Sequence, residues 1–239
     1  MIIAHRGDTH AGLENTMPAF ESALKLGIDG IECDLQLSRD GRVVVFHDDD
    51  FSRLADREGK LGHFTFDELS KIRLAKDGRI PALEDLLELV RDRCLLNLEI
   101  KTKPRWHAFG SGRLERAVVD ALKKFGLGDS IVVSSFHPMP LFRMRRLAPH
   151  LKRGVLFESK YWLHRMAIPL TAPSSLHPPL KFATPSLIHS AHDAGRRVLV
   201  WTVNAEDDMK KLWESGVDGI ITDEPRRLQA ILQGTSGQR

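Results

Sequence analysis

Short apolar runs alternate with amphipathic segments along almost the whole chain. Seven runs are typical of buried strands: IIAH near the start, GIECDLQL at 30–37, LLNLEI at 95–100, IVVSSF at 131–136, GVLF at 154–157, RVLVWTV at 197–203 and DGIITD at 218–223. The spacing leaves room for an eighth near Leu176. Strands that alternate with helices form a parallel sheet covered by helices, so the pattern predicts an α/β protein.

Three intervening segments show the spacing of apolar side chains that an amphipathic helix requires. The apolar positions are Leu83, Leu86, Leu87 and Val90 in one segment, Met209, Leu212 and Trp213 in another, and Phe20, Ala23 and Leu24 in the third. We expect Asn204 to cap the helix that Gly216 ends, and Asn15 or Thr16 to open the helix that Gly27 closes.

The stretch GIDGIECD at 27–34 has a near copy, GVDGIITD, at 216–223. Recurring helix-to-strand joints would produce such a repeat. Eight strand–helix units in 239 residues predict a (β/α)8 TIM barrel, and the lack of a Pro/Gly/Ser-rich linker favours a single domain over 1–239. The alternative is an open doubly wound sheet, but no G-x-G-x-x-G follows the first strand.

Charge and cysteine content narrow the function classes. The formal charge of +3 and pI near 8.9 fall short of a nucleic-acid-binding composition and fit a small anionic substrate. No apolar run is long enough for a membrane span and the first residues are unlike a signal peptide, so we expect a cytoplasmic protein. Cys33 and Cys94 are expected to be buried thiols, since no CxxC spacing is present.

Glu32 is the residue that distinguishes the two joints, because Ile221 occupies the matching position in the second copy. Side chains alternate along a strand, so Glu32 and Asp34 share one face. Two carboxylates about 6 Å apart repel by roughly 3 kcal/mol at an effective dielectric near 20. We therefore expect a positive charge between them.

A hairpin is expected at Asp40-Gly41, between LQLSR and RVVVF. A regular two-residue turn pairs residues whose numbers sum to 81. That register places Asp34 opposite His47.

The ends of two further strands carry polar residues. The run LLNLEIK places Glu99 and Lys101 on one face, and the first strand ends in His5-Arg6-Gly7. In a barrel these positions lie at the C-terminal ends of the strands, where active sites form. The three acids, Glu32, Asp34 and Glu99, suit one hard divalent cation, Mg²⁺ or Ca²⁺, better than zinc. Arg6 and Lys101 suit a phosphate group.

These residues belong to an ordered series that resembles the glycerophosphodiester phosphodiesterases. The series runs almost from end to end: His5-Arg6-Gly7, Glu14-Asn15-Thr16, Pro18-Ala19-Phe20, Gly30-Ile31-Glu32-Cys33-Asp34, Asp40-Gly41, His47-Asp48, Ile80-Pro81 with LEDLL, Glu99-Ile100-Lys101, Val200-Trp201-Thr202-Val203-Asn204 and the GVDGIITD stretch. Each motif is weak alone, but the complete set in order is highly specific.

The resemblance implies a (β/α)8 barrel with a small insertion after the second strand, at about residues 49–79. It implies metal-dependent hydrolysis of glycerophosphodiesters such as glycerophosphocholine or glycerophosphoethanolamine to sn-glycerol 3-phosphate and an alcohol. Roles carried over onto this chain are metal ligation by Glu32, Asp34 and Glu99, acid–base catalysis by His5 and His47, phosphate binding by Arg6 and Lys101, and contact with glycerol by Trp201. Which histidine is the base, and whether a cyclic phosphate forms, stay open.

Alternatives remain at this point. A lysophospholipase D on the same barrel would hydrolyse lysophospholipids, and a non-catalytic phosphate-binding barrel would keep the fold without turnover. The segment 138–170 carries seven Lys or Arg against one acid, with Tyr161, Trp162, Leu163 and Met166 interleaved. It could form a solvated helix face, or it could contact a membrane or a lysophospholipid.

Overall fold

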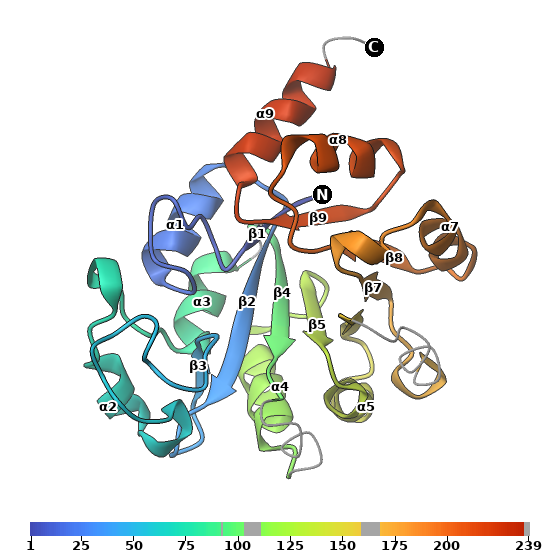
Figure 1. The fold of residues 1–239 in the computed structure, drawn as a ribbon. Helices are drawn as coiled ribbons and strands as arrows, with labels where there is room; N and C mark the ends of the chain where they lie inside the picture. Colours follow the sequence, from blue (N-terminus) through green and yellow to red (C-terminus); the bar gives the residue numbers. More distant parts are fainter. Residues whose placement is uncertain (92, 103–110, 159–167, 237–239) are drawn as a thin grey trace.

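The computed structural model describes residues 1–91, 93–102, 111–158 and 168–236, and in them eight parallel strands close into a barrel (Figure 1). The strands are β1 (Ile2–His5), β2 (Gly30–Leu37), β4 (Leu95–Ile100), β5 (Ile131–Ser135), β6 (Lys152–Leu156), β7 (Ser175–His177), β8 (Arg197–Val200) and β9 (Gly219–Thr222). Each pairs with the next in chain order, and β1 pairs with both β2 and β9 to complete the closure. The predicted TIM barrel is confirmed, including the strand near Leu176.

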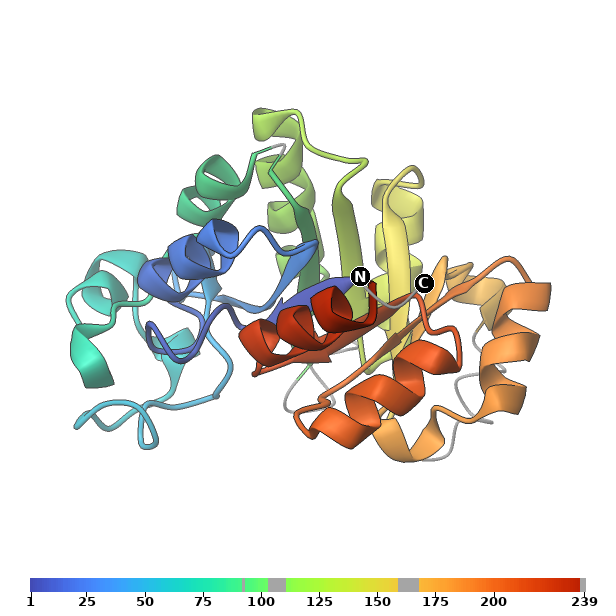
Figure 2. The same ribbon diagram turned by 90° about the horizontal axis from the view of Figure 1, so that it is seen from above.

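Helices surround the strands on all sides (Figures 1 and 2). Their bounds are α1 (Met17–Lys25), α3 (Leu83–Val90), α4 (Arg113–Phe125), α5 (Pro138–Leu147), α7 (Pro185–Asp193), α8 (Glu206–Glu214) and α9 (Pro225–Ser236). The outward strand residues Ile31, Cys33 and Leu35 belong to the same buried cluster as the apolar face of α3. Alternation thus directs Cys33 towards the helices and leaves the barrel interior to Glu32 and Asp34. No helix in the described ranges is both long enough and apolar enough to cross a membrane.

Two expectations for α8 were wrong. Ala205 is the residue that caps α8, without a side-chain hydrogen bond, because Asn204 turns its amide towards Asp223 instead. Trp213 keeps 40% of its surface exposed, while Met209 and Leu212 are buried. The apolar stripe of α8 is therefore narrower than predicted.

The strand register sorts the barrel interior into an apolar floor and a polar upper layer. Ile3, Leu199 and Ile221 form a small buried cluster at the floor. Above it, Glu32 lies in register with His5 on one side and with Asn97 on the other. Parallel strands bring their C-terminal ends to the same end of the barrel, so the polar layer faces that end.

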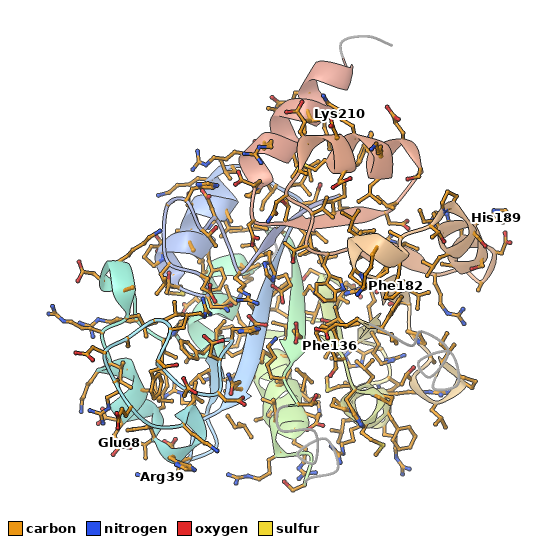
Figure 3. The ribbon with its side chains drawn as sticks, viewed as in Figure 1. Arg39, Glu68, Phe136, Phe182, His189 and Lys210 are labelled. Carbon is orange, nitrogen blue, oxygen red and sulfur yellow. The ribbon has the colours of Figure 1, made fainter. Side chains whose placement is uncertain are left out.

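The chain between β2 and α3 builds a second, smaller core beside the barrel (Figures 1 and 2). It contains β3 (Val43–Val45), α2 (Phe66–Ser70) and the 3₁₀ turns η1 (Leu61–His63) and η2 (Ala75–Asp77). Its buried residues are Val44, Phe46, Phe51, Leu54, Leu61, Leu69, Leu74 and Ile80. A capping box of Thr65 and Glu68 begins α2. Arg39 contacts Glu68 at the outer edge of this segment, far from Phe136 near the barrel centre (Figure 3).

The hairpin register was wrong by one residue. In the structure β3 pairs antiparallel to β2 with Leu35 opposite Val45 and Leu37 opposite Val43. Phe46, not His47, is opposite Asp34, and its N–H donates to the Asp34 carbonyl at 2.9 Å. The turn contains three residues rather than two, because Gly41 takes the left-handed φ of 86° that ends such loops.

Candidate active site

Three carboxylates meet at the polar end of the barrel. Glu32 and Asp34 come from β2 and Glu99 from β4, and one oxygen from each lies within 4.8 Å of the others. Asp34 is fully buried, and Glu32 and Glu99 are 3% and 7% exposed. The structure thus brings together the three acids that the sequence analysis singled out. Oxygen donors at this separation fit a single hard cation.

Two cations already touch the acids. Lys101 Nζ lies 2.8 Å from Asp34 Oδ1 and 2.7 Å from Glu99 Oε1. Arg6 Nε lies 3.1 Å from Asp34 Oδ2. Arg6 reaches this position because its φ of 58° turns the chain sharply out of β1, and its backbone N–H donates to Glu32 Oε2 at 3.3 Å. The structure thus brings both expected phosphate-binding side chains to the acid cluster.

The three acids differ in pKa because the positive charges of Lys101 and Arg6 do not act equally on their carboxylates. Burial would raise the pKa of Asp34, but Lys101 and Arg6 outweigh it and hold this pKa below its usual value. Burial, together with the charge of Asp34, raises the pKa of Glu32 to about 8. Burial also raises the pKa of Glu99, against the opposing effect of Lys101. Glu32 and Glu99 lack sufficient positive charge nearby, which is what a divalent cation between them would supply.

His5 ends β1 and is held by a carboxylate on the neighbouring strand end. Its Nδ1 lies 2.7 Å from Asp223 Oδ1, and its Nε2 lies 3.9 Å from Glu32 Oε2. Asn204 fixes Asp223 in turn, donating from Nδ2 to Oδ2 at 2.7 Å and accepting from the Asp223 N–H at 3.0 Å. Burial lowers the pKa of His5, but the hydrogen bond to Asp223 and the charge of Glu32 outweigh it, so the pKa is raised.

His47 follows β3 and has an acid partner of its own. Its Nδ1 lies 2.6 Å from Asp48 Oδ1. Burial and the charge of Lys101 lower the pKa of His47 from its usual value. The corrected register therefore still places this imidazole at the cavity, although beyond the end of the strand ladder.

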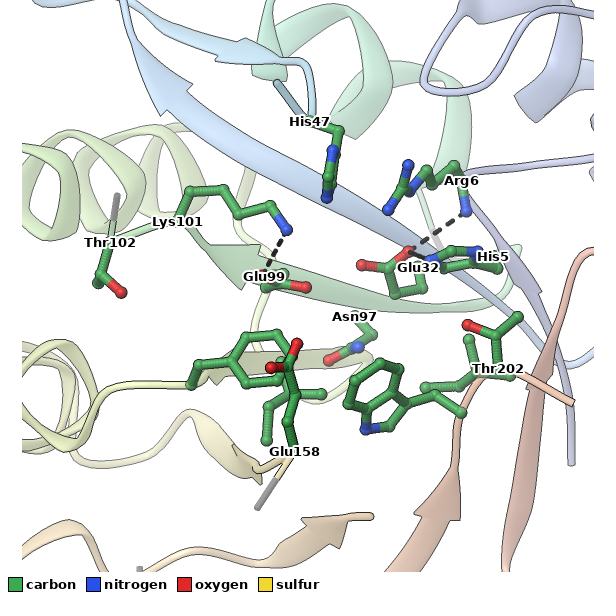
Figure 4. A pocket seen from close by; sticks show the side chains of 14 residues that line it. His5, Arg6, Glu32, His47, Asn97, Glu99, Lys101, Thr102, Glu158 and Thr202 are labelled. Atoms are coloured by element: carbon green, nitrogen blue, oxygen red, sulfur yellow. Dashed lines mark hydrogen bonds and ion pairs between the residues drawn. The ribbon is translucent and has the colours of Figure 1, made fainter. Parts of the chain in front are cut away.

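Both histidines, Glu32, Glu99 and the two cations Arg6 and Lys101 line one cavity of about 260 Å³ (Figure 4). Its opposite wall is mostly apolar and includes Phe136, Leu156, Trp201 and Ile221. Trp201 is fixed by a hydrogen bond from Nε1 to the His177 carbonyl at 2.7 Å and by an edge contact with Phe136 at 5.3 Å between ring centroids. A ligand in this cavity meets the acids, histidines and cations on one side and, on the other, an aromatic surface that also carries Glu158.

Sequence reasoning assigned no site role to the residues that orient the charged groups. Asp223 closes the second copy of the repeated joint and was interpreted as scaffold, and Asn204 was interpreted as a helix cap. Asn15 donates from Nδ2 to Asp34 Oδ2 at 2.7 Å from a left-handed φ of 57°. The available signal was the position of Asp223 at a strand end, matching that of Asp34 in the first joint.

Several basic side chains of the segment 138–170 make contacts within the protein, which its composition alone does not indicate. Arg143 pairs with Glu115 at 2.9 Å, and Arg145 donates to the carbonyl of Pro169. Arg153 is 9% exposed and donates to the Thr171 carbonyl. The predicted aromatic contact surface at Tyr161, Trp162, Leu163 and Met166 lies outside the described residues.

A closed parallel barrel whose strand ends carry clustered acids, two carboxylate-bound histidines and two cations is a barrel enzyme suited to a phosphorylated substrate. The profile of the Glycerophosphoryl diester phosphodiesterase family matches residues 5–227. The chain belongs to this family and is a phosphoric diester hydrolase of the glycerophosphodiester phosphodiesterase type.

Relatives support this membership over the full length. A glycerophosphodiester phosphodiesterase from Caldanaerobacter subterraneus subsp. tengcongensis is 37% identical, over 95% of this chain and 96% of the relative. One from Bacillus altitudinis is 34% identical, over 96% and 97%. This chain is also similar to the solved structure of an Oleispira antarctica phosphodiesterase in complex with the product sn-glycerol-3-phosphate. The two sequences are 28% identical, the TM-score is 0.88, and the match covers 98% of this chain and 96% of that one.

Proposed function

We propose that this protein hydrolyses glycerophosphodiesters, such as glycerophosphocholine or glycerophosphoethanolamine, to sn-glycerol 3-phosphate and an alcohol. The observation that carries the proposal is the cavity lined by both histidines, both cations and two acids, Glu32 and Glu99, which cluster with the buried Asp34. The product named in the Oleispira antarctica structure supports the same chemistry here. We further propose that the whole chain, 1–239, works as one domain.

We propose Glu32, Asp34 and Glu99 as the ligands of one divalent cation, Mg²⁺ or Ca²⁺. Their carboxylate oxygens are the donors that both cations prefer. The pKa of about 8 at Glu32 supports a missing positive charge at this position. When bound, such a cation stabilises the negative charge that develops on the phosphoryl oxygens.

Arg6 and Lys101 are proposed as the phosphate-binding groups. Both are engaged with Asp34, and Lys101 also with Glu99. With the charge of these acids taken up by a bound cation, the guanidinium of Arg6 and the ammonium of Lys101 would be available to the substrate phosphate. Neutralising the acids and binding phosphate are therefore compatible roles for Lys101.

His47 and His5 are proposed as base and acid respectively. The lowered pKa of His47 keeps its imidazole unprotonated, which suits removal of a proton from the attacking hydroxyl. His5 is bound through Nδ1 to Asp223, which leaves Nε2 to donate a proton to the leaving oxygen. Trp201 is proposed to cover the glycerol portion, where its ring forms the wall with Phe136.

Substrate comparison tests the proposal. When glycerophosphocholine and lysophosphatidylcholine are supplied at equal concentration, we expect the protein to act on glycerophosphocholine and to release glycerol 3-phosphate from it. Preference for lysophosphatidylcholine would favour a lysophospholipase D, and no turnover of either with Mg²⁺ or Ca²⁺ would favour a non-catalytic phosphate-binding barrel.

A further inference from the structure

One arginine of the small core beside the barrel contacts two acids at the edge of the active site. Arg53 donates from Nε to Asp48 Oδ2 at 2.7 Å. It also donates from Nη1 to Glu14 Oε2 at 2.8 Å and from Nη2 to Glu14 Oε1 at 2.6 Å. The contact with Glu14 is bidentate, so the guanidinium plane fixes the orientation of that carboxylate as well as its distance.

Each of the two acids also holds a group that we assign to the reaction. The second oxygen of Asp48 contacts His47 Nδ1 at 2.6 Å. Glu14 Oε1 accepts from Arg6 Nη1 at 2.8 Å, and Arg6 in turn contacts Asp34. Arg53 itself does not line the cavity among the described residues, so its influence on the substrate passes through these two acids.

Residues on either side of Arg53 are anchored in the small core. Phe51 and Leu54 are both buried there, at 0% and 8% exposure. Phe51 also contacts the rings of Phe46 and Phe64 at 5.8 and 5.5 Å between centroids. The side chain of Arg53 is 46% exposed, so solvent screens its ion pairs in part, while the bidentate geometry fixes the orientation of Glu14.

We propose that Arg53 is a positioning residue through which the small core beside the barrel sets the active site: it holds Asp48 and Glu14 so that His47 and Arg6 point correctly into the cavity. This gives the segment between β2 and α3 a part in assembling the site. A lysine cannot reproduce it, because one ammonium lacks the planar fork that spans both carboxylates. The expected change in activity rests on the proposed function. The placement of Asp48 and Glu14 by Arg53 does not depend on turnover.

The test compares Arg53→Ala and Arg53→Lys with Arg57→Ala. Arg57 is a matched control, because it is an exposed arginine of the same segment that lies over the Phe64 ring at 5.1 Å, with no ion pair among the described residues. We expect kcat/KM for glycerophosphocholine to fall about 100-fold in Arg53→Ala, since misplacement of reacting groups by about 1 Å has that effect. Arg53→Lys should recover only part of the loss, and added guanidinium should partly restore Arg53→Ala.

A second readout does not require turnover. The His47 ring, titrated by NMR, is faced by Lys101, Asp34, Arg6 and Asp48. Without Arg53 the charge of Asp48 acts on His47 uncompensated, so the titration midpoint should rise in Arg53→Ala and stay unchanged in Arg57→Ala. An unchanged midpoint in Arg53→Ala would overturn the proposal, whatever the activity. The proposal would also be overturned if Arg53→Ala lost activity together with a lowered unfolding temperature and guanidinium did not restore that activity. An inactive wild-type enzyme would refute the proposed function instead and leave this readout valid.

Discussion

Lys101 and Asp34 form an ion pair of 2.8 Å at a depth where Asp34 is fully buried and Lys101 is 10% exposed. Burial lowers the pKa of Lys101, yet the two acids it contacts outweigh that effect and raise it. Lys101 therefore stays charged and supplies part of the positive charge that the proposed divalent cation would add to the acid cluster. The same ammonium is the group that we propose binds the substrate phosphate.

Replacing Lys101 by Met should destabilise the protein mainly when divalent cations are removed. Breaking a buried ion pair leaves uncompensated charge at a cost of about 3 kcal/mol. Urea unfolding in chelator should show this loss, and excess Mg²⁺ or Ca²⁺ should recover most of it. Lys71→Met, which removes an exposed pair with Asp67, is the control and should change stability by less than about 1 kcal/mol. Equal stability of wild type and Lys101→Met in chelator would contradict this interpretation.

Replacing Asp223 by Asn should impair His5 without disturbing the barrel. The carboxylate that holds Nδ1 at 2.7 Å raises the pKa of His5, so its loss lowers the protonated fraction. We expect kcat for glycerophosphocholine to fall about 100-fold, within the range attributed to general acid–base catalysis. Asp193→Asn removes an exposed carboxylate from His189 and should leave kcat unchanged. A wild-type kcat in Asp223→Asn would remove His5 from the acid role.

The pH profile of kcat/KM should show an acid limb set by His47. Because burial and Lys101 lower the pKa of this imidazole, the base stays active below the ordinary midpoint of about 6.5. Asp48 acts in the opposite direction, so Asp48→Asn should move the limb to still lower pH. A limb above pH 6.5 in the wild type, or one that moves upward in Asp48→Asn, would contradict the assignment of His47 as base.

His177 should make the fold sensitive to acid. Burial lowers its pKa to about 3, and its Nε2 lies 2.8 Å from Ser175 Oγ inside the barrel. Below pH 6.5 the unfolded chain protonates this histidine and the folded protein does not, so stability falls as pH decreases towards 3. The largest slope from one such group is about 1.4 kcal/mol per pH unit.

Comparison with His177→Asn isolates this effect. Urea unfolding at pH 7 and pH 5 should show the wild type losing about 2 kcal/mol more than the variant over this interval. An equal loss in both proteins would mean that His177 is protonated inside the fold.

The fold was predictable because its determinants are local. Buried strands and amphipathic helices follow the period of their apolar residues, and the apolar face of α3 was assigned correctly from Leu83, Leu86, Leu87 and Val90. The hairpin register was not predictable from Asp40-Gly41 alone, since that dipeptide fits a two-residue or a three-residue turn. Only the pairing of Leu37 with Val43 decides between them.

The acids, histidines and cations of the site were found because each lies in an expected strand or follows the end of one. Their orienting partners come from loops distant in sequence: Asp223 reaches His5 across 218 positions, and Arg53 reaches Glu14 across 39. Asn204 has the ordinary properties of a helix cap, and only the neighbouring strand end gives it another partner. Such contacts depend on the tertiary arrangement of the loops, which a local pattern does not encode.

The most direct measurement is the release of sn-glycerol 3-phosphate from glycerophosphocholine by protein stripped of metal and then supplied with Mg²⁺ or Ca²⁺. We predict turnover with the cation, and a fall of at least about 100-fold with chelator or in Glu32→Gln, whose amide keeps the shape but not the charge. Undiminished release of product by the chelated enzyme, or by Glu32→Gln, would contradict the claim that these buried acids hold a catalytic cation.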